Sequence, residues 1–294
     1  MNRVRRSLLL AAAAAAAPAW GQAAPLLRKK IPSSGEPIPV IGLGTARRYE
    51  RPAPGLRGTL QRFGALGGSV IDTAPVYGDA ESVVGGLVHE LGMRERLFLA
   101  TKVSTTGREA GVRQIEQSFR QLRTATIDLI AVHNLRDTQV HLATLRELKK
   151  QGRIRYVGIT TSSDRQYADF EQTMRREPLD FIQVDYALDN RGAGERILPL
   201  AAERGMAVMV NLPFGRGRLF EAVRGKALPA WAAEFDCASW PQFFLKYIVS
   251  HTAVTCAVPG MARPEYAEDN LGAARGRLAD AAMRRRMESF IDAI

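Results

Sequence analysis

The sequence predicts a closed, parallel (β/α)8 barrel, and three observations indicate this fold. Short apolar runs of strand length recur along the whole chain, and segments with helical spacing lie between them. This alternation of strand and helix repeats eight times, which is typical of an all-parallel barrel. The chain has 294 residues, which leaves room for a barrel of about 250 residues after an N-terminal leader. We therefore expect one domain with a sizeable core and no internal linker.

Eight apolar runs define the predicted strands, which we place near 40–45, 69–75, 97–103, 127–133, 156–161, 181–186, 207–213 and 253–258. Helical spacing between them predicts helices at 82–91, 112–122, 140–150, 165–175, 194–204 and 240–250. A doubly wound open sheet would show the same alternation. We favour the barrel, because the first turn, Ile41-Gly-Leu-Gly-Thr-Ala46, lacks the third glycine of a dinucleotide-binding fingerprint.

The first 23 residues have the pattern of an export signal. Arg3, Arg5 and Arg6 precede an alanine-rich apolar stretch that is too short to span a membrane. The arginine pair before Ser-Leu-Leu resembles a twin-arginine signal, which exports folded proteins, and an ordinary secretory signal is the alternative. Cleavage after Ala23 would leave a barrel over residues 24–294. We expect this mature protein in the periplasm and not embedded in a membrane.

Charge and cysteine content argue against several other classes of protein. The net charge is +11, and loss of the three leader arginines leaves +8. The remaining basic residues are scattered and do not alternate with aromatic residues, so nucleic-acid binding is not expected. Cys237 and Cys256 provide no disulfide framework, and we expect two free thiols, although a bridge between them stays open. His89, His141 and His251 are isolated, so no metal cluster is predicted.

Four chemically reactive side chains stand at the ends of three successive apolar runs. Asp72 and Tyr77 follow the second predicted strand, Lys102 ends the third, and His133 ends the fourth. In (β/α)8 barrels the working residues lie at the C-terminal ends of the strands. A turn residue, a rim aromatic, a solvated charge or a structural histidine would explain each residue alone. Together, the four predict one polar site.

The combination of these groups suits transfer of a proton to an oxygen atom. A phenol with an ordinary pKa of about 10 needs a neighbour before it exchanges protons readily at neutral pH. We expect the ammonium of Lys102 to lower the pKa of Tyr77, and the carboxylate of Asp72 to hold Lys102. His133 would donate a hydrogen bond to a carbonyl oxygen or share a proton with Tyr77. The set fits a reaction in which a carbonyl carbon receives a hydride.

The motifs around these residues resemble the aldo-keto reductase superfamily. The resemblance covers nearly all of the mature chain, and it rests on Ile71-Asp-Thr-Ala-Pro-Val-Tyr-Gly78, Glu81-Ser-Val-Val-Gly85, Ala100-Thr-Lys102 and Val132-His133. It implies a (β/α)8 barrel that binds a nicotinamide cofactor, usually NADPH, and reduces small-molecule aldehydes or ketones. It also implies that Tyr77 is the general acid, that Lys102 and Asp72 tune it, and that His133 orients the substrate carbonyl.

The resemblance implies a nicotinamide-binding end that departs from the usual family pattern. Thr160 and Thr161 stand where the family usually has Ser-Asn holding the carboxamide, so Thr161 lacks the amide. Gln183 matches a further carboxamide-binding position. Asn211 stands where many members have a tyrosine that stacks on the nicotinamide, and a polar strand-end cap is the alternative explanation for it.

The phosphate and adenosine ends of the cofactor are implied by two later segments. The first, Phe214-Gly-Arg-Gly-Arg-Leu219, resembles the loop over the pyrophosphate, where glycines admit phosphate and Arg216 or Arg218 adds charge. Tyr266 stands where NADPH-specific members often have an arginine for the 2′-phosphate, with Arg263 as a nearby substitute, so NADPH is favoured over NADH only modestly. The other implied cofactor-binding residues are Gly44, Thr45, Pro213, Phe214, Gly215, Gly217, Arg218, Leu219, Pro259, Gly260, Asp269 and Asn270.

The substrate is not specified by these motifs. The chain ends soon after its last predicted helix, so we expect loops around 46–54 and 188–191 to form the pocket walls. Trp231 and Phe235 are further pocket candidates, although packing explains aromatic residues in such positions more often. The alternative function is a cofactor-bound periplasmic sensor or partner-binding subunit with little turnover. A hydrolase on the same barrel would need a nucleophile constellation that the sequence does not offer.

Overall fold

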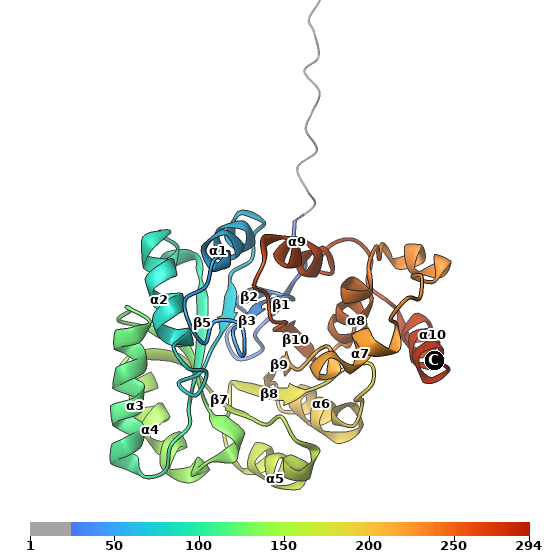
Figure 1. Cartoon of the computed structure of the whole chain (residues 1–294). Coiled ribbons are helices and arrows are strands. Elements are labelled where there is room, and N and C mark those ends of the chain that lie inside the picture. The colour runs from blue at the N-terminus through green and yellow to red at the C-terminus, as the bar shows by residue number, and fades with distance from the viewer. Residues whose placement is uncertain (1–24) are drawn as a thin grey trace, which may run out of the picture.

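A closed barrel of eight parallel strands forms the centre of the protein. The structure, a computed structural model, describes residues 25–294, so the predicted export signal lies outside it. The strands follow one another around the sheet in chain order (Figure 1): β3 (Leu43–Gly44), β4 (Val70–Asp72), β5 (Phe98–Val103), β6 (Ile127–Val132), β7 (Ile154–Thr160), β8 (Phe181–Asp185), β9 (Ala207–Asn211) and β10 (Val254–Ala257). Parallel bridges from Ile41 to Ala257 and from Gly44 to Gly260 close the sheet. The predicted (β/α)8 barrel is confirmed.

Closure of the barrel depends on a glycine at the end of the short first strand. The N–H group of Gly44 donates to the carbonyl of Pro259 at 2.9 Å. A Cβ atom on Gly44 would lie only 2.5 Å from the carbonyl oxygen of Val258. Any larger residue would push the first and last strands apart. The glycine therefore permits the close approach that completes the rim on which the site is built.

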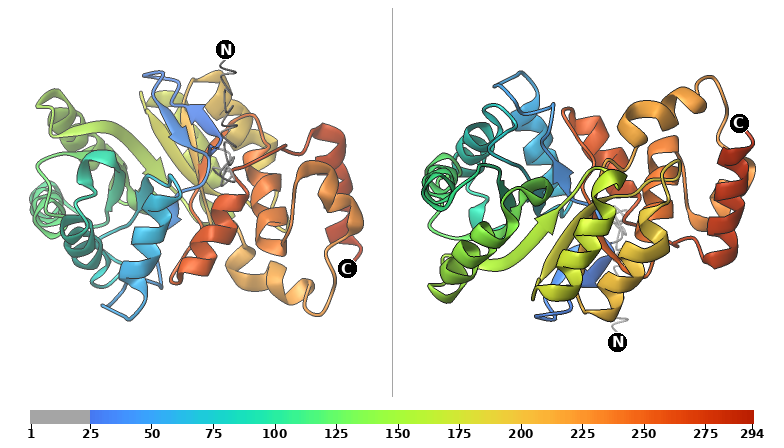
Figure 2. Two further views of the ribbon diagram at one scale, coloured as in Figure 1. Left: turned by 90° about the horizontal axis from the view of Figure 1, so that it is seen from above. Right: turned by 90° about the horizontal axis from the view of Figure 1, so that it is seen from below.

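Helices cover the outside of the barrel (Figures 1 and 2). In chain order they are α1 (Leu56–Ala65), α2 (Ala80–Glu90), α3 (Arg108–Gln121), α4 (Thr138–Lys150), α5 (Tyr167–Arg176), α6 (Ala193–Glu203), α7 (Arg218–Ala222), α8 (Trp240–Val249), α9 (Pro264–Gly272) and α10 (Ala281–Asp292). The six predicted helices correspond to α2 to α6 and α8, with ends that differ by a few residues. None of the helices in residues 25–294 is both long and apolar enough to span a membrane.

The beginnings of two helices near the C-terminus show how local sequence fixes an element. Ser239 precedes α8, and its hydroxyl accepts a hydrogen bond from the N–H group of Gln242. Asp280 precedes α10, and its carboxylate accepts from the N–H group of Met283 at 2.7 Å. Such caps satisfy backbone donors that have no partner within the helix. These two caps set where α8 and α10 begin.

A short antiparallel hairpin precedes the barrel and was not predicted from the sequence. Its strands are β1 (Arg28–Lys30) and β2 (Pro37–Pro39), drawn in blue in Figure 2. Ile31 and Ile38 are buried in the same apolar cluster as the inward-facing residues of the barrel strands. The Nζ atom of Lys29 donates to the carbonyls of Val249, His251 and Val254 at 2.7 to 2.8 Å. The hairpin thus closes the N-terminal end of the barrel.

The two cysteines take no part in crosslinking. Cys237 and Cys256 are both buried, and both are free thiols, as predicted. Cys256 lies in β10 and contributes to the cluster inside the barrel. Burial raises the pKa of the Cys237 thiol to about 11, which keeps it protonated and unreactive at neutral pH.

Candidate active site

The four predicted catalytic side chains come together at the C-terminal ends of neighbouring strands. Asp72 is the last residue of β4, and Lys102 is the last but one of β5. His133 directly follows β6. Tyr77 lies in the loop between β4 and α2. Asp72, Tyr77 and His133 line one pocket of about 520 Å³ at this end of the barrel. β4 pairs in parallel with β5, and β5 pairs in parallel with β6. The strand ends that carry Asp72, Lys102 and His133 therefore lie side by side.

Lys102 and Asp72 form a buried ion pair below the pocket. The ammonium of Lys102 donates to both carboxylate oxygens of Asp72 and to the carbonyl oxygen of Thr73, each at 2.8 Å. Only 1% of Lys102 and 6% of Asp72 is exposed. Burial lowers the pKa of Lys102, but Asp72 and Tyr77 outweigh burial and raise it overall. Lys102 therefore stays an ammonium ion.

Tyr77 lies beside this ion pair and keeps its proton. The Nζ atom of Lys102 is 5.2 Å from the centroid of the phenol ring. Burial raises the pKa of Tyr77, Lys102 lowers it and Asp72 raises it, with a net direction above the ordinary value. Lys102 lowers the pKa of Tyr77 as expected, but burial and Asp72 together outweigh the ammonium, so the net pKa lies above the ordinary value. Tyr77 is thus a phenol in the resting protein and can serve as a proton donor.

His133 lies opposite Tyr77 and carries no charge. The two rings meet edge to face, with centroids 5.9 Å apart and planes at 86°. The Nδ1 atom of His133 is 2.5 Å from the hydroxyl oxygen of Ser104. Burial, followed by the charges of Lys102 and Arg136, lowers the pKa of His133 to about 3. The imidazole is therefore neutral across the ordinary pH range, with one N–H group available.

Polar side chains suited to an amide ligand line the same pocket. Thr160, Gln183 and Asn211, which the resemblance implies as cofactor-binding residues, are at its wall. Asn211 donates through Nδ2 to the carbonyl oxygen of Thr161 at 2.9 Å, while its Oδ1 atom is buried without a hydrogen-bond partner. Among residues 25–294, the one hydrogen-bond partner of the Gln183 side chain is the weakly accepting sulfur of Met209, at 3.3 Å. The Oδ1 atom of Asn211 and the amide of Gln183 thus retain hydrogen-bonding capacity beside the pocket.

Thr161, a predicted cofactor-binding residue, is turned away from the pocket. Its hydroxyl donates to Oε1 of Gln166 at 2.8 Å, and the carbonyl oxygen of Ser163 lies 3.2 Å from the same hydroxyl. Thr161 does not line the pocket wall. Asn211, at the end of β9 and two strands away in the sheet, donates through its side chain to the Thr161 backbone carbonyl.

The glycine-rich loop after β9 reaches the pocket through its first half. Pro213, Phe214 and Gly217 line the wall, and Arg216 lies between them as the pocket's cation on this side. Leu219 is 1% exposed and packs in the core instead. The predicted Gly215–Gly217 cradle is a 3-10 turn with Arg216 in a left-handed conformation. The N–H groups of Gly215 and Gly217 are bonded within the loop, to the carbonyls of Leu212 and Phe214, so the guanidinium of Arg216 is what the loop offers to an anion.

Arg218 makes a contact within the protein, and its cofactor-binding role stays a prediction. Its Nε atom is 2.8 Å from Oδ2 of Asp189, which lies in the loop after β8. Gly215 has a φ of 56°, and a Cβ atom there would lie 2.4 Å from the same carboxylate oxygen. Asp189 thus contacts the glycine-rich loop at two places. It pairs with Nε of Arg218 and lies close against Gly215.

The segment predicted to bind the adenosine end divides into open and engaged residues. Gly260 lines the pocket, as do Gly44 and Thr45 at the end of β3, whereas Pro259 and the buried Asn270 do not. The guanidinium of Arg263 lies over the ring of Tyr266, 5.8 Å from its centroid, and both are exposed. Asp269 is occupied, because it accepts from the side chains of Ser239 and Gln242 at 2.6 and 2.8 Å. Arg263 is therefore the exposed cation of this segment.

Of the two loops predicted to form the pocket walls, one lines the pocket. Residues Ala46, Arg47, Arg48 and Glu50 of the loop after β3 line the pocket, as expected for 46–54. Residues 188–191 do not line it, because Asp189 is engaged with Arg218. Trp231 and Phe235 also lie outside it, in an aromatic cluster with Phe243 and Phe290. The wall residues that the sequence did not predict are Asn134, Ser162, Leu212, Phe220 and Val258.

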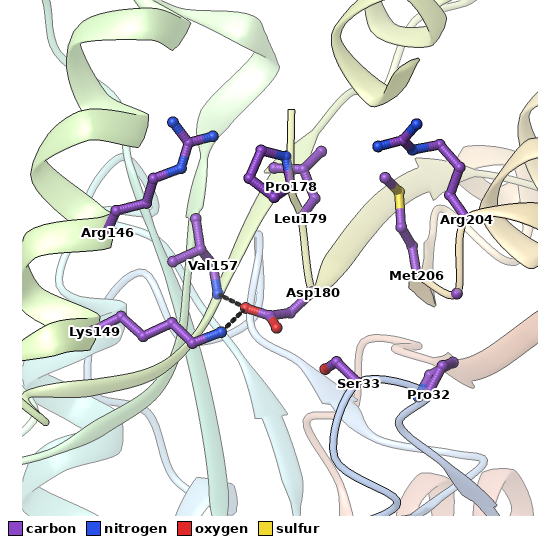
Figure 3. Close-up of a pocket in the computed structure, with 11 residues that line it drawn as sticks. Pro32, Ser33, Arg146, Lys149, Val157, Pro178, Leu179, Asp180, Arg204 and Met206 are labelled. Carbon is purple, nitrogen blue, oxygen red and sulfur yellow. Dashed lines mark hydrogen bonds and ion pairs between the residues drawn. The ribbon is translucent and has the colours of Figure 1, made fainter. Parts of the chain in front are cut away.

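A second hollow lies at the opposite end of the barrel and has no comparable chemistry. It measures about 510 Å³ and opens near the beginnings of β8 and β9 (Figure 3). Its carboxylate, Asp180, accepts from Nζ of Lys149 at 2.6 Å and from the N–H group of Val157 at 2.9 Å. Arg146, on the same side, is paired with Glu177. These contacts tie the strand ends to α4, and none of the predicted site residues lies here.

Comparison with known proteins agrees with this geometry. The sequence profile of the Aldo/keto reductase family matches residues 40–290, and the chain belongs to this family. Methylglyoxal reductase YeaE of Escherichia coli is 30% identical over 271 residues, which cover 86% of this chain and 92% of that protein. Aldo-keto reductase YhdN of Bacillus subtilis is 32% identical over 166 residues, which cover 51% of this chain and 49% of that protein.

Solved structures show the same barrel. An aldo/keto reductase from Klebsiella pneumoniae in complex with NADP and acetate superimposes with a TM-score of 0.69 at 27% identity, covering 87% of this chain and 93% of that chain. A second Klebsiella pneumoniae aldo-keto reductase, in complex with NADPH, has a TM-score of 0.72 at 26% identity, covering 87% and 92%. The protein is thus an aldo-keto reductase whose relatives include proteins with bound NADP or NADPH.

Proposed function

We propose that the protein reduces the carbonyl group of a small aldehyde or ketone, with NADPH as the hydride donor and Tyr77 as the general acid. The observation that carries this proposal is the arrangement of Tyr77 and His133, which lie edge to face at the wall of one pocket, beside the buried pair of Lys102 and Asp72. A phenol, a neutral imidazole and a buried ammonium fit a carbonyl oxygen that gains negative charge and then a proton.

Each group has a distinct task in this reaction. NADPH, when bound, supplies the hydride that the carbonyl carbon accepts. Tyr77, which holds its proton in the resting protein, gives that proton to the carbonyl oxygen. Lys102 stays charged through Asp72 and stabilises the phenolate that remains. The neutral His133 donates a hydrogen bond that orients the carbonyl oxygen beside Tyr77.

The residues around the pocket fit a nicotinamide cofactor. A carboxamide both donates and accepts hydrogen bonds, and the unpartnered Oδ1 atom of Asn211, together with Gln183 and Thr160, offers both kinds of partner. Arg216 and the glycine-rich loop suit the pyrophosphate, and the exposed Arg263 suits a 2′-phosphate. The relatives solved with NADP and NADPH support the same cofactor here.

Titration with NADPH and NADH side by side tests the cofactor. Calorimetry and tryptophan fluorescence of the purified protein should show saturable binding of NADPH, with weaker binding of NADH because only NADPH carries the 2′-phosphate. Arg263→Met should weaken NADPH binding toward that of NADH and leave NADH binding nearly unchanged. Flat titrations with both cofactors would remove the basis of the proposed reductase.

The place of this chemistry is a further part of the proposal. The pair Arg5-Arg6 in the leader supports export of the folded barrel to the periplasm, with cofactor loaded beforehand. Arg5→Lys together with Arg6→Lys should then retain the protein in the cytoplasmic fraction, whereas equal periplasmic recovery would point to ordinary secretion. Export also favours the second candidate, a cofactor-bound sensor. Tight NADPH binding without turnover on a panel of aldehydes, 2-oxoaldehydes, ketones and sugars would support that candidate.

A further inference from the structure

We infer that Ser104 is a positioning residue, which holds the proton of His133 on Nε2 by donating its own hydroxyl hydrogen to Nδ1. The inference rests on the proposed function, because the hydrogen bond from Nε2 matters for a substrate carbonyl. Ser104 does not line the pocket, and it would act on the substrate only through the imidazole.

The position of Ser104 is fixed by the strand before it and by a helix behind it. It directly follows β5, one residue beyond Val103 and two beyond Lys102. Its backbone N–H group donates to Oε1 of Gln114, on α3, at 2.6 Å. The side chain is buried, and its hydroxyl oxygen lies 2.5 Å from Nδ1 of His133. Serine and imidazole are thus held at short hydrogen-bond distance by the framework of the barrel.

The hydrogen-bond inventory decides which of the two groups donates. A neutral imidazole has one N–H group and one bare nitrogen, whereas a hydroxyl both donates and accepts. Within residues 25–294, Nδ1 of His133 is the hydrogen-bond partner of the Ser104 hydroxyl, and no other acceptor contacts it. If Nδ1 carried the proton, the buried hydroxyl hydrogen of Ser104 would have no acceptor. If Ser104 donates to Nδ1 instead, its hydroxyl hydrogen is satisfied. The single N–H proton of the imidazole is then on Nε2.

The outcome matters because a carbonyl oxygen accepts hydrogen bonds and cannot donate them. Nε2 is the nitrogen of His133 that is left for the pocket, where the imidazole faces Tyr77. With the proton on Nε2, the ring donates to the carbonyl oxygen beside the phenol. With the proton on Nδ1, a nitrogen lone pair would face the oxygen and repel it. Ser104 therefore selects the form of His133 that can orient the substrate.

The tautomer can be measured without cofactor or substrate. Long-range proton–nitrogen correlation spectra of protein labelled with ¹⁵N-histidine distinguish the two neutral forms, and His133→Gln identifies the signal among the four histidines. We expect the Nε2–H form in the unsubstituted protein and in Ser104→Thr, which keeps the hydroxyl. In Ser104→Ala we expect a mixture of both forms. A proton on Nδ1 in the unsubstituted protein would overturn the inference.

Kinetics then connects the tautomer to catalysis. In Ser104→Ala, kcat should fall about tenfold, less than the 10²–10³-fold loss typical when an oxyanion-stabilising donor is removed outright. NADPH affinity and the thermal unfolding midpoint should stay near those of the unsubstituted protein, and Ser104→Thr should recover kcat. Thr106→Ala removes an exposed hydroxyl from the same loop and should leave both tautomer and kcat unchanged. A fall in kcat without a tautomer change, or the reverse, would contradict the positioning role.

The two proposals fail in distinguishable ways. If the unsubstituted protein binds no NADPH and reduces no carbonyl compound, the proposed function fails, whatever the spectra show. If it reduces carbonyl compounds but His133 carries its proton on Nδ1, the inference about Ser104 alone fails.

Discussion

Burial governs the proton chemistry of Tyr77 more strongly than the nearby ammonium does. The pKa of the phenol is raised, although Lys102 lies 5.2 Å from the ring centroid. Lys102 therefore contributes less to forming phenolate in the resting protein than to stabilising phenolate after proton transfer. The carboxylate of Asp72 keeps that ammonium in place through two hydrogen bonds of 2.8 Å. The phenol of Tyr77, the ammonium of Lys102 and the carboxylate of Asp72 thus act together.

The buried ion pair predicts an asymmetric response to substitution. Lys102→Met should lower the free energy of unfolding by about 3–5 kcal/mol, because Asp72 is left as a buried charge without its cation. Lys102→Met combined with Asp72→Asn should lose less stability than the single variant. Urea denaturation measures both values. As a control, Arg57→Met breaks the exposed pair with Glu90 and should change stability by about 1 kcal/mol or less. A single variant as stable as this control would refute the buried-charge argument.

At the scale of elements, the loops after the strands decide which predicted residues reach the pocket. The glycine-rich loop after β9 is held by Asp189 from the loop after β8, which engages Arg218 and packs against Gly215. Arg216 is left to face the pocket. Such partners engage the side chains of Arg218, Thr161 and Asp269, and Leu219 packs in the core. Sequence spacing identifies a segment, but it does not reveal which neighbour has already engaged a side chain.

Gly215→Ala tests the fit of this loop. The residue has a left-handed φ of 56°, and the added Cβ atom would lie 2.4 Å from a carboxylate oxygen of Asp189. Backbone strain of this kind costs on the order of 1–3 kcal/mol. We expect the dissociation constant for NADPH to rise about tenfold, equivalent to about 1.4 kcal/mol, in calorimetry. Gly225→Ala has similar backbone strain but no atom within 4 Å, and it should leave NADPH affinity unchanged. Equal affinities in the two variants would contradict the account.

For the molecule as a whole, the two ends of the barrel have separate tasks. The C-terminal end carries the pocket, and the N-terminal end is closed by the hairpin β1–β2 and by ion pairs beside the second hollow. The barrel and the positions of the four reactive residues could be predicted, because apolar runs and strand-end motifs are local features. The hairpin could not, because its charged residues Arg28-Lys-Lys30 look like a surface cluster. Only the fold shows that Lys29 binds three backbone carbonyls.

The separation of the two ends predicts that stability and catalysis can be changed independently. Lys29→Met should lower the free energy of unfolding by about 2 kcal/mol, because charge-assisted hydrogen bonds to three carbonyls are lost in a partly buried site. The kcat of the folded variant should stay unchanged, since the hairpin lies at the end opposite Tyr77. Denaturant unfolding measures the expected loss of stability, and steady-state kinetics measures the expected constancy of kcat. Loss of kcat with unchanged stability would contradict this division.

The central claim is that Tyr77 gives a proton to a carbonyl oxygen as its carbon receives a hydride. Its most direct test is the rate of NADPH oxidation with a panel of aldehydes and 2-oxoaldehydes, compared between the unsubstituted protein and Tyr77→Phe. The account predicts that the unsubstituted protein turns over and that Tyr77→Phe loses about 10²–10⁴-fold in kcat, with NADPH affinity by calorimetry nearly unchanged. Retained turnover in Tyr77→Phe would contradict the account.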